Sequence, residues 1–164
     1  MFNSNIPSNI AREELDIAND VSIIFCTRSL KPVYNIDIIL KSINGVKQYY
    51  PKVKYVFAFN YHNLLEDMKN YITSNKLDEN VVWAGYIEHD TKLPYYYQDA
   101  DVVLSVPSSD SSPMSVYEAM AMKKPVIASD LPWVYENFKP GVNITIVEPR
   151  NISDLVSSIL KVLD

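Results

Sequence analysis

Small polar and acidic side chains are concentrated in one stretch of the sequence, SSDSSPMSVYEAMA, which runs from residue 108 to residue 121. Proline is favoured at the first position of a helix, so Ser112 followed by Pro113 predicts that a helix begins there. The N-terminus of a helix presents free backbone N–H groups that can bind a phosphate. The hydroxyls of Ser111, Ser112 and Ser115 would add donors without blocking access. The stretch therefore predicts a phosphate site at the start of a helix.

Two carboxylates flank this predicted helix start, Asp110 before it and Glu118 in its second turn. On either side of a bound phosphate, each could accept hydrogen bonds from a pair of hydroxyls, one pair from a ribose and one from a sugar. That arrangement would suit a nucleotide-sugar site. A simpler alternative also fits, because Asp110, Ser111 and Ser112 could be turn residues. In that alternative Ser115 and Glu118 form a capping box, which needs no ligand.

The rest of the chain alternates short apolar runs with segments of helical spacing. Strands are predicted at residues 21–27, 53–59, 80–84, 101–106, 125–128 and 143–147, and helices at residues 35–50, 64–72, 90–99, 113–123, 131–138 and 152–163. This alternation predicts an α/β fold, a Rossmann-like doubly wound parallel sheet of about six strands with helices on both faces. Ligands of such folds bind beyond the carboxyl ends of the strands, and the serine-rich stretch directly follows the fourth strand.

Length and composition limit the possible classes of protein. A chain of 164 residues is long enough for one domain with a buried core. Residues 1–19 are polar and are interpreted as an irregular linker, and residues 20–164 as the Rossmann-like domain. The net charge of −5 argues against broad nucleic-acid binding. No apolar stretch is long enough for a membrane span, and the single cysteine, Cys26, lies in an apolar run that favours a buried thiol.

Asp110 to Ala121 resembles the acidic motif of retaining GT-B glycosyltransferases of family 4, the glycosyl transferases group 1, with aspartate in place of the commoner glutamate. Other segments that resemble this family are residues 28–30, 82–86, 97–102 and 125–130, and Glu136. Together the resemblance covers roughly residues 21–163. It implies that the chain is the C-terminal, donor-binding half of a two-domain enzyme. The N-terminal acceptor domain would then be missing, or would be supplied by a partner subunit.

The resemblance also implies roles for the residues of the acidic motif. Glu118 would hold the ribose hydroxyls of the sugar nucleotide, and Asp110 would touch the donor sugar. Ser111 and residues 112–115, which include Met114, would hold the sugar and the phosphate. The donor implied is a UDP- or GDP-sugar.

Residues outside the motif receive roles from the same resemblance. Arg28 would act in catalysis with Asp110 by stabilising the leaving diphosphate as its charge develops. Tyr86, with Ile87 beside it, would border the base. No metal and no other cofactor is expected, because Arg28 and the helix dipole would stabilise the leaving group instead.

The chain departs from the family pattern near Arg28. Thr27 stands where the family usually has glycine. Tyr34 falls near the usual position of a lysine, and Lys31 is close to that position in sequence. A weaker hold on the diphosphate is the expected consequence of losing that lysine.

Other side chains near the predicted site have structural alternatives. His89 precedes Asp90 at a predicted helix start, which favours a capping or surface role over catalysis. A site that is open on one side would expose aromatic side chains that could equally pack in the core, namely Tyr86, Tyr95, Tyr96 and Trp133.

The function implied is the donor-binding half of a glycosyltransferase that transfers a hexose to a glycan or a lipid-linked acceptor. The isolated half is expected to transfer little or nothing. A cytoplasmic location is expected, and the full enzyme would lie at the inner membrane face, so that contact with the membrane would be indirect. Two alternatives remain open: another GT-B enzyme, such as a nucleotide-sugar epimerase, and a non-catalytic scaffold domain with this fold.

Overall fold

The structure is a computed structural model that describes residues 2–61 and 64–164. One six-stranded parallel sheet lies at its centre, with the strand order β3-β2-β1-β4-β5-β6. The strands are β1 Ile23–Cys26, β2 Lys54–Ala58, β3 Val81–Gly85, β4 Val102–Ser105, β5 Val126–Ser129 and β6 Thr145–Val147. This is the doubly wound parallel sheet predicted from the sequence, and that prediction is confirmed.

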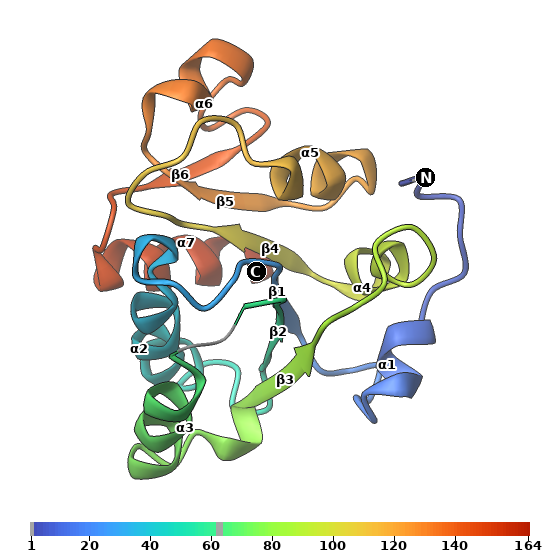
Figure 1. The fold of residues 1–164 in the computed structure, drawn as a ribbon, viewed down its shortest axis with the longest axis vertical. Coiled ribbons are helices and arrows are strands. Elements are labelled where there is room, and N and C mark those ends of the chain that lie inside the picture. The colour runs from blue at the N-terminus through green and yellow to red at the C-terminus, as the bar shows by residue number, and fades with distance from the viewer. Residues whose placement is uncertain (1, 62–63) are drawn as a thin grey trace.

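Helices cover both faces of the sheet (Figure 1). They are α1 Ile10–Glu14, α2 Ile36–Val46, α3 Leu65–Ser74, α4 Leu93–Asp99, α5 Met114–Ala121, α6 Pro132–Asn137 and α7 Ile152–Leu163. One hydrophobic core lies under α2, α3 and α7, and a second lies under α1, α4, α5 and α6.

The residues of β1 explain why its sequence is a continuous apolar run. Ile24 and Cys26 belong to the first core, whereas Ile23 and Phe25 belong to the second. A parallel strand that is buried on both faces needs apolar side chains at successive positions. Cys26 is buried as predicted, and burial raises the pKa of its thiol to about 11.

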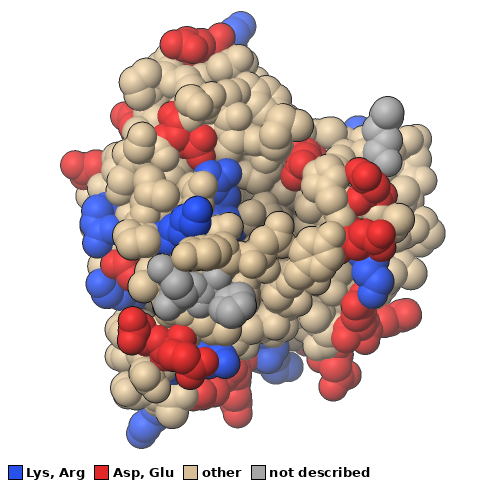
Figure 2. All heavy atoms as spheres, in the orientation of Figure 1, with Lys and Arg blue, Asp and Glu red and all other residues tan. Residues whose placement is uncertain are grey.

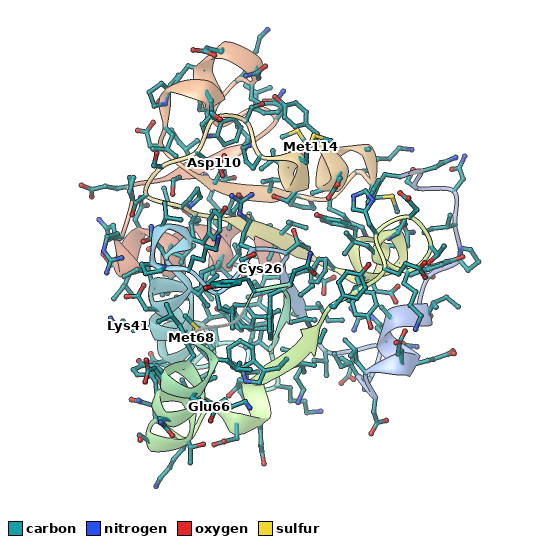
Figure 3. The ribbon with its side chains drawn as sticks, viewed as in Figure 1. Cys26, Lys41, Glu66, Met68, Asp110 and Met114 are labelled. Atoms are coloured by element: carbon teal, nitrogen blue, oxygen red, sulfur yellow. The ribbon has the colours of Figure 1, made fainter. Side chains whose placement is uncertain are left out.

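The strand order places a topological switch point between β1 and β4, because the chain leaves these two neighbours in opposite directions across the sheet. In open α/β sheets the ligand crevice forms at such a point, outside the carboxyl ends of the strands. Most of the residues that the sequence selected as site candidates follow β1 and β4, whereas Tyr86 and Ile87 follow β3. Figure 3 labels Asp110 in the loop that leads to α5 and Met114 at the start of that helix, with Cys26 near the centre of the molecule.

The segment predicted to be irregular, residues 1–19, contains α1, and in this respect the prediction was wrong. The carboxylate of Asp99 at the end of α4 accepts hydrogen bonds from the backbone N–H groups of Asn9 at 2.6 Å, Ala11 at 2.8 Å and Arg12 at 3.1 Å. Arg12 is itself buried and donates to the carbonyl of Val21 at 2.7 Å. Because the carboxylate that caps α1 comes from a distant part of the chain, the sequence around α1 does not show the cap. The division into a linker and a domain stays a prediction.

Candidate functional site

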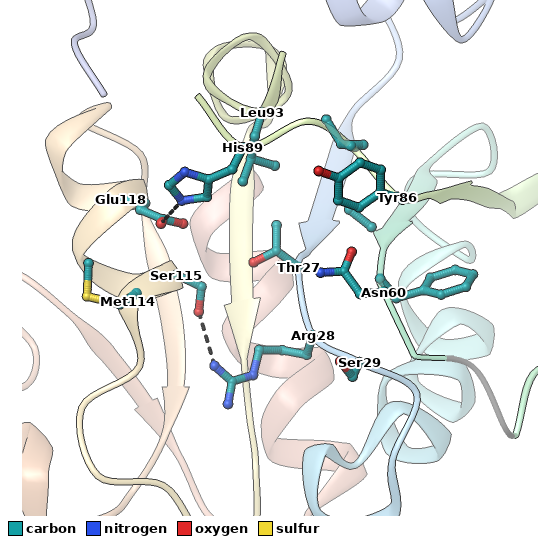
Figure 4. Close-up of a pocket in the computed structure, with 13 residues that line it drawn as sticks. Thr27, Arg28, Ser29, Asn60, Tyr86, His89, Leu93, Met114, Ser115 and Glu118 are labelled. Atoms are coloured by element: carbon teal, nitrogen blue, oxygen red, sulfur yellow. Dashed lines mark hydrogen bonds and ion pairs between the residues drawn. The ribbon is translucent and has the colours of Figure 1, made fainter. Parts of the chain in front are cut away.

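A pocket of about 320 Å³ opens at the carboxyl edge of the sheet, next to the switch point (Figure 4). Its walls come from the segments that follow β1, β2 and β3 and from the first turns of α5. Six of the predicted site residues line it, namely Arg28, Tyr86, Ile87, Met114, Ser115 and Glu118. Lysine and arginine side chains gather near the centre of this face of the molecule, beside its hollow (Figure 2).

The start of α5 differs from the prediction. The helix begins at Met114, and Pro113 is an N-cap with extended backbone rather than the first helical residue. Ser112 does not cap the helix. It has a φ of 100°, and its hydroxyl lies 2.7 Å from that of Tyr117. Pro113 disfavours helical backbone at the preceding residue, Ser112. The helix therefore begins after the Ser112–Pro113 pair, at Met114.

Arg28 reaches from the loop after β1 to the start of α5. Its guanidinium forms an ion pair with Asp110, and its Nη1 lies 3.5 Å from Oγ of Ser115. The aromatic ring of Tyr34 stacks on the same guanidinium, with 4.2 Å between Cζ and the ring centroid. Arg28 and Asp110 are mostly buried, so the charge of each is held in a partly desolvated place. The structure thus brings together Arg28, Asp110 and Ser115.

Among the described residues that line the pocket, none is a lysine that could replace the family lysine. Tyr34, near its position in the sequence, contributes a ring to Arg28 instead of a charge. Lys31 is exposed, its Nζ lies 4.9 Å from the ring centroid of Tyr61, and it is absent from the described lining of the pocket.

Glu118 is buried, and both of its carboxylate oxygens have partners. Oε1 lies 2.7 Å from Nε2 of His89, and Oε2 accepts a hydrogen bond from the hydroxyl of Tyr97 at 2.9 Å. The capping-box alternative is not formed, because Ser115 lies inside the helix and Glu118 points to His89 and Tyr97. The hydrogen bonds to Glu118 and Asp90 raise the pKa of His89.

Three residues of this network were missed by the sequence analysis. His89 was expected at a cap or on the surface, and its side chain is 56% exposed. It also lines the pocket and contacts Glu118, which was not predicted. Tyr97 is fully buried, which raises the pKa of its hydroxyl and keeps it a donor. Thr27 reaches that hydroxyl at 3.1 Å. No spacing in the sequence links these residues, which lie on different elements of the sheet edge.

The predicted aromatic group divides between the surface and the core. Tyr86 is 70% exposed at the rim of the pocket, whereas Tyr96 and Trp133 are buried and Tyr95 is partly buried. Core packing, the alternative interpretation, is therefore correct for Tyr96 and Trp133, which pack in the second core. Among the predicted donor-binding residues, Ser111 and Ser112 lie outside the described lining of the pocket.

In the part of the chain that the structure describes, no group of three or more His, Cys, Asp or Glu side chains could hold a metal ion. Across residues 2–61 and 64–164, no helix has the length and the apolar character that crossing a membrane requires.

The family model of glycosyl transferases group 1 matches residues 8–164. The chain belongs to this family. A curated relative of this group 1 domain is the poly(ribitol-phosphate) alpha-N-acetylglucosaminyltransferase of Staphylococcus aureus (strain COL), which is 25% identical over 134 residues. The match covers 81% of this chain and 26% of that enzyme, so the chain spans about a quarter of the length of that relative.

Solved structures confirm the fold of this group 1 domain. The C-terminal domain of the group 1 protein LpcC from Francisella tularensis has a TM-score of 0.86 at 16% identity, covering 99% of this chain and 85% of that one. HepE from Anabaena, in complex with UDP and glucose, has a TM-score of 0.82 at 21% identity, covering 94% and 41% of the two chains. A variant of TarM from Staphylococcus aureus, in complex with Fondaparinux, alpha-GlcNAc-glycerol and UDP, has a TM-score of 0.76 at 24% identity, covering 86% and 28%. The fold is that of a C-terminal GT-B glycosyltransferase domain.

Proposed function

We propose that this domain binds the sugar nucleotide of a retaining glycosyltransferase, which transfers a hexose from a UDP- or GDP-sugar to a glycan or lipid-linked acceptor. The observation that carries the proposal is the convergence of Arg28, Ser115 and Glu118 on one pocket at the switch point of the sheet. These three residues come from two distant parts of the sequence, and together they offer a cation, a hydroxyl and a carboxylate.

Each part of a sugar nucleotide has a suitable partner in this pocket. The carboxylate of Glu118 would accept the ribose hydroxyls. The diphosphate would lie between Arg28 and the first turn of α5, where backbone N–H groups without helical partners favour an anion. The base would lie against exposed Tyr86 and buried Ile87, which follow β3. The UDP in the HepE and TarM complexes supports a sugar nucleotide as the ligand.

The proposed chemistry depends on stabilisation of the leaving group. When the bond between the sugar and the diphosphate breaks, negative charge develops on the diphosphate oxygens. In this proposal Arg28 and the N-terminus of α5 stabilise that charge, and Arg28 exchanges its ion pair with Asp110 for the diphosphate. Asp110 would contact the donor sugar. In this proposal the site works without a metal ion.

The proposal also concerns what the chain needs from elsewhere. A GT-B site lies between two Rossmann-like domains, and this chain provides one of them. We therefore expect the chain alone to bind a sugar nucleotide weakly and to transfer little sugar until an acceptor domain or subunit completes the site. The complete enzyme would work in the cytoplasm at the inner membrane face.

Calorimetric titration tests the proposal. UDP, GDP and their common sugar conjugates are titrated into the wild-type chain, into Glu118→Ala and into Glu66→Ala. Glu66 is an exposed carboxylate on α3, far from Asp110 and Met114 in Figure 3, so its removal controls for the loss of one charge. Saturable binding that is lost in Glu118→Ala and kept in Glu66→Ala supports the proposal and identifies the base. Equal binding by all three chains contradicts it, and a lack of binding by the wild type favours a scaffold domain.

A further inference from the structure

The hydrogen bonds from His89 and Tyr97 occupy only half of the acceptor positions of the Glu118 carboxylate. An ionised carboxylate has about four acceptor positions, two on each oxygen. His89 occupies one position on Oε1, and Tyr97 occupies one on Oε2. One position on each oxygen stays available, which is what a pair of neighbouring hydroxyls requires. The two partners thus fix the rotation of the carboxylate and leave it able to accept a diol.

The two partners of Glu118 differ in how firmly they are held. Tyr97 is fully buried, its hydroxyl lies 3.1 Å from that of Thr27, and its ring packs edge-on against Phe25. His89 lies in the loop between β3 and α4, and its side chain is 56% exposed. The orientation of His89 therefore depends on a few neighbours.

The neighbours of His89 come from three parts of the chain. Its ionisable partners are Glu118 from α5 and Asp90 from its own loop, the latter 2.9 Å from Nδ1. The third neighbour is Phe2, whose ring meets the imidazole edge-on with 5.1 Å between the ring centroids. Phe2 also meets the ring of Tyr97 edge-on, at 5.6 Å. One phenyl ring therefore touches both partners of the Glu118 carboxylate.

Residues 2–8, which we name the N-terminal strap, carry Phe2 to this position. The strap is anchored at its far end, where Asp99 accepts the backbone N–H groups of Asn9, Ala11 and Arg12. From there it runs past α4, and its N-terminal end lies beside α5 (Figure 1). Phe2 and Ile6 are partly buried against the second core.

We propose that the N-terminal strap, through Phe2, holds the His89 ring against Glu118 and so sets the orientation of the carboxylate that binds the ligand. Phe2 and His89 are positioning residues in this proposal, which rests on the proposed nucleotide site. Each nitrogen of a protonated His89 can donate to one carboxylate, Nε2 to Glu118 and Nδ1 to Asp90. After deprotonation only one N–H remains, so the hold on Glu118 weakens as the pH rises.

A ligand-free measurement tests the hold on His89. The sequence has two histidines, His62 and His89, and NMR titration of their imidazole protons resolves both, with His89→Gln assigning the signals. We expect the pKa of His89 to lie above 6.5 in the wild type and to return toward 6.5 in Phe2→Ala. Ile10→Ala, which removes an exposed apolar side chain from α1, should leave it unchanged. Phe2→Leu keeps apolar bulk without an aromatic edge and replaces Phe2→Ala if that variant does not fold.

A binding measurement tests the consequence for the site. UDP and GDP are titrated separately into each variant between about pH 6 and pH 8, across the range in which a histidine titrates. The terminal phosphate of UDP and GDP also titrates near pH 6, in the same way for every variant, so the affinities are compared at each pH. Relative to His89→Gln, the affinity of the wild type should fall as the pH rises. His89→Ala should weaken binding roughly tenfold, as expected for a lost charge-assisted hydrogen bond. His89→Gln keeps a donor without a charge, so it should restore most of the affinity and keep only the pH dependence of the nucleotide itself. Phe2→Ala should weaken binding roughly threefold to tenfold.

The outcomes separate this proposal from the function on which it rests. If the wild type binds neither nucleotide, the proposed function fails and the role of the strap fails with it. If the wild type binds, and Phe2→Ala changes neither the affinity nor the pKa of His89, the proposed role of the N-terminal strap is wrong. The proposed nucleotide site is not affected by that result. Weaker binding by Phe2→Ala, together with a lowered pKa of His89, supports the proposal.

Discussion

Arg28 and Asp110, 82 residues apart in the sequence, form an ion pair across the switch point between β1 and β4. The side chains are 13% and 16% exposed, so bulk water screens the pair only partly. Arg28 is the cation proposed for the diphosphate, and Asp110 is the acid proposed for the donor sugar. In this structure each of them is the partner of the other, and a bound diphosphate would compete with Asp110 for the guanidinium.

This competition makes a prediction for Asp110→Asn. The variant removes the charge that neutralises Arg28, so we expect UDP or GDP, whichever the wild type binds, to bind about three- to tenfold more tightly. The sugar conjugate should gain less, because the carboxylate proposed to touch the sugar is lost. Calorimetric titration measures both affinities. Asp20→Asn, which removes an exposed carboxylate, should have no effect. Weaker binding of the free nucleotide by Asp110→Asn would show that the pair does not compete with the ligand.

The pH dependence of stability follows from His89. Hydrogen bonds to Glu118 and Asp90 raise its pKa above 6.5 in the folded chain, so the folded chain binds this proton more tightly than the unfolded chain. The resulting stability is complete below the unfolded pKa and is lost as the pH rises through the folded pKa. We expect the free energy of unfolding of the wild type, relative to His89→Gln, to be level below about pH 6.5 and to fall above it, within a series from about pH 5 to pH 8. Urea denaturation across this range measures it, and a constant difference would contradict the prediction.

The elements of the fold could be predicted because their sequence patterns are local. Residues 21–27 form an apolar run whose central part is β1, since a strand buried on both faces cannot tolerate polar side chains. The helix predicted at residues 152–163 is α7 with the same bounds, because Oδ1 of Asn151 caps its first turn by accepting a hydrogen bond from the backbone N–H of Asp154. The location of the pocket followed from the rule that ligands of such folds bind beyond the carboxyl ends of the strands.

The parts that could not be predicted depend on contacts between distant residues. The cap of α1 is supplied by Asp99, 88 residues beyond Ala11. The contact between His89 and Glu118 joins a loop after β3 to a helix after β4, and no residue pattern encodes that distance. The predicted start of α5 was wrong for another reason. The fixed φ of Pro113 suits both an extended N-cap and a first helical residue, so the sequence does not distinguish the two.

The close approach of Gly45 on α2 to Val156 on α7 leads to a prediction about the packing of these two helices. A Cβ at this position would lie 2.8 Å and 2.9 Å from the two methyl carbons of Val156. Alanine favours a helix over glycine by about 1 kcal/mol, but overpacking costs typically about 1–3 kcal/mol. We therefore expect Gly45→Ala to lower the free energy of unfolding. In a Val156→Ala background, which removes both methyl groups, the same change should raise it by about 1 kcal/mol. Urea denaturation of the four chains measures this reversal, and a loss in both backgrounds would contradict it.

Tyr97 tests whether the hydroxyl that holds Glu118 matters for binding. Tyr97→Phe keeps the buried ring and removes the hydrogen bond to Oε2 of Glu118. Because that bond joins a hydroxyl to a carboxylate, we expect nucleotide affinity to fall by about ten- to a hundredfold while the fold is kept. Tyr55→Phe is the matched control, since Tyr55 is equally buried but its hydroxyl lies 3.4 Å from that of Ser42 in the other core. Titration with UDP and GDP measures the affinity, and thermal unfolding checks the fold. Equal affinity in the two variants would mean that His89 alone is enough to orient Glu118.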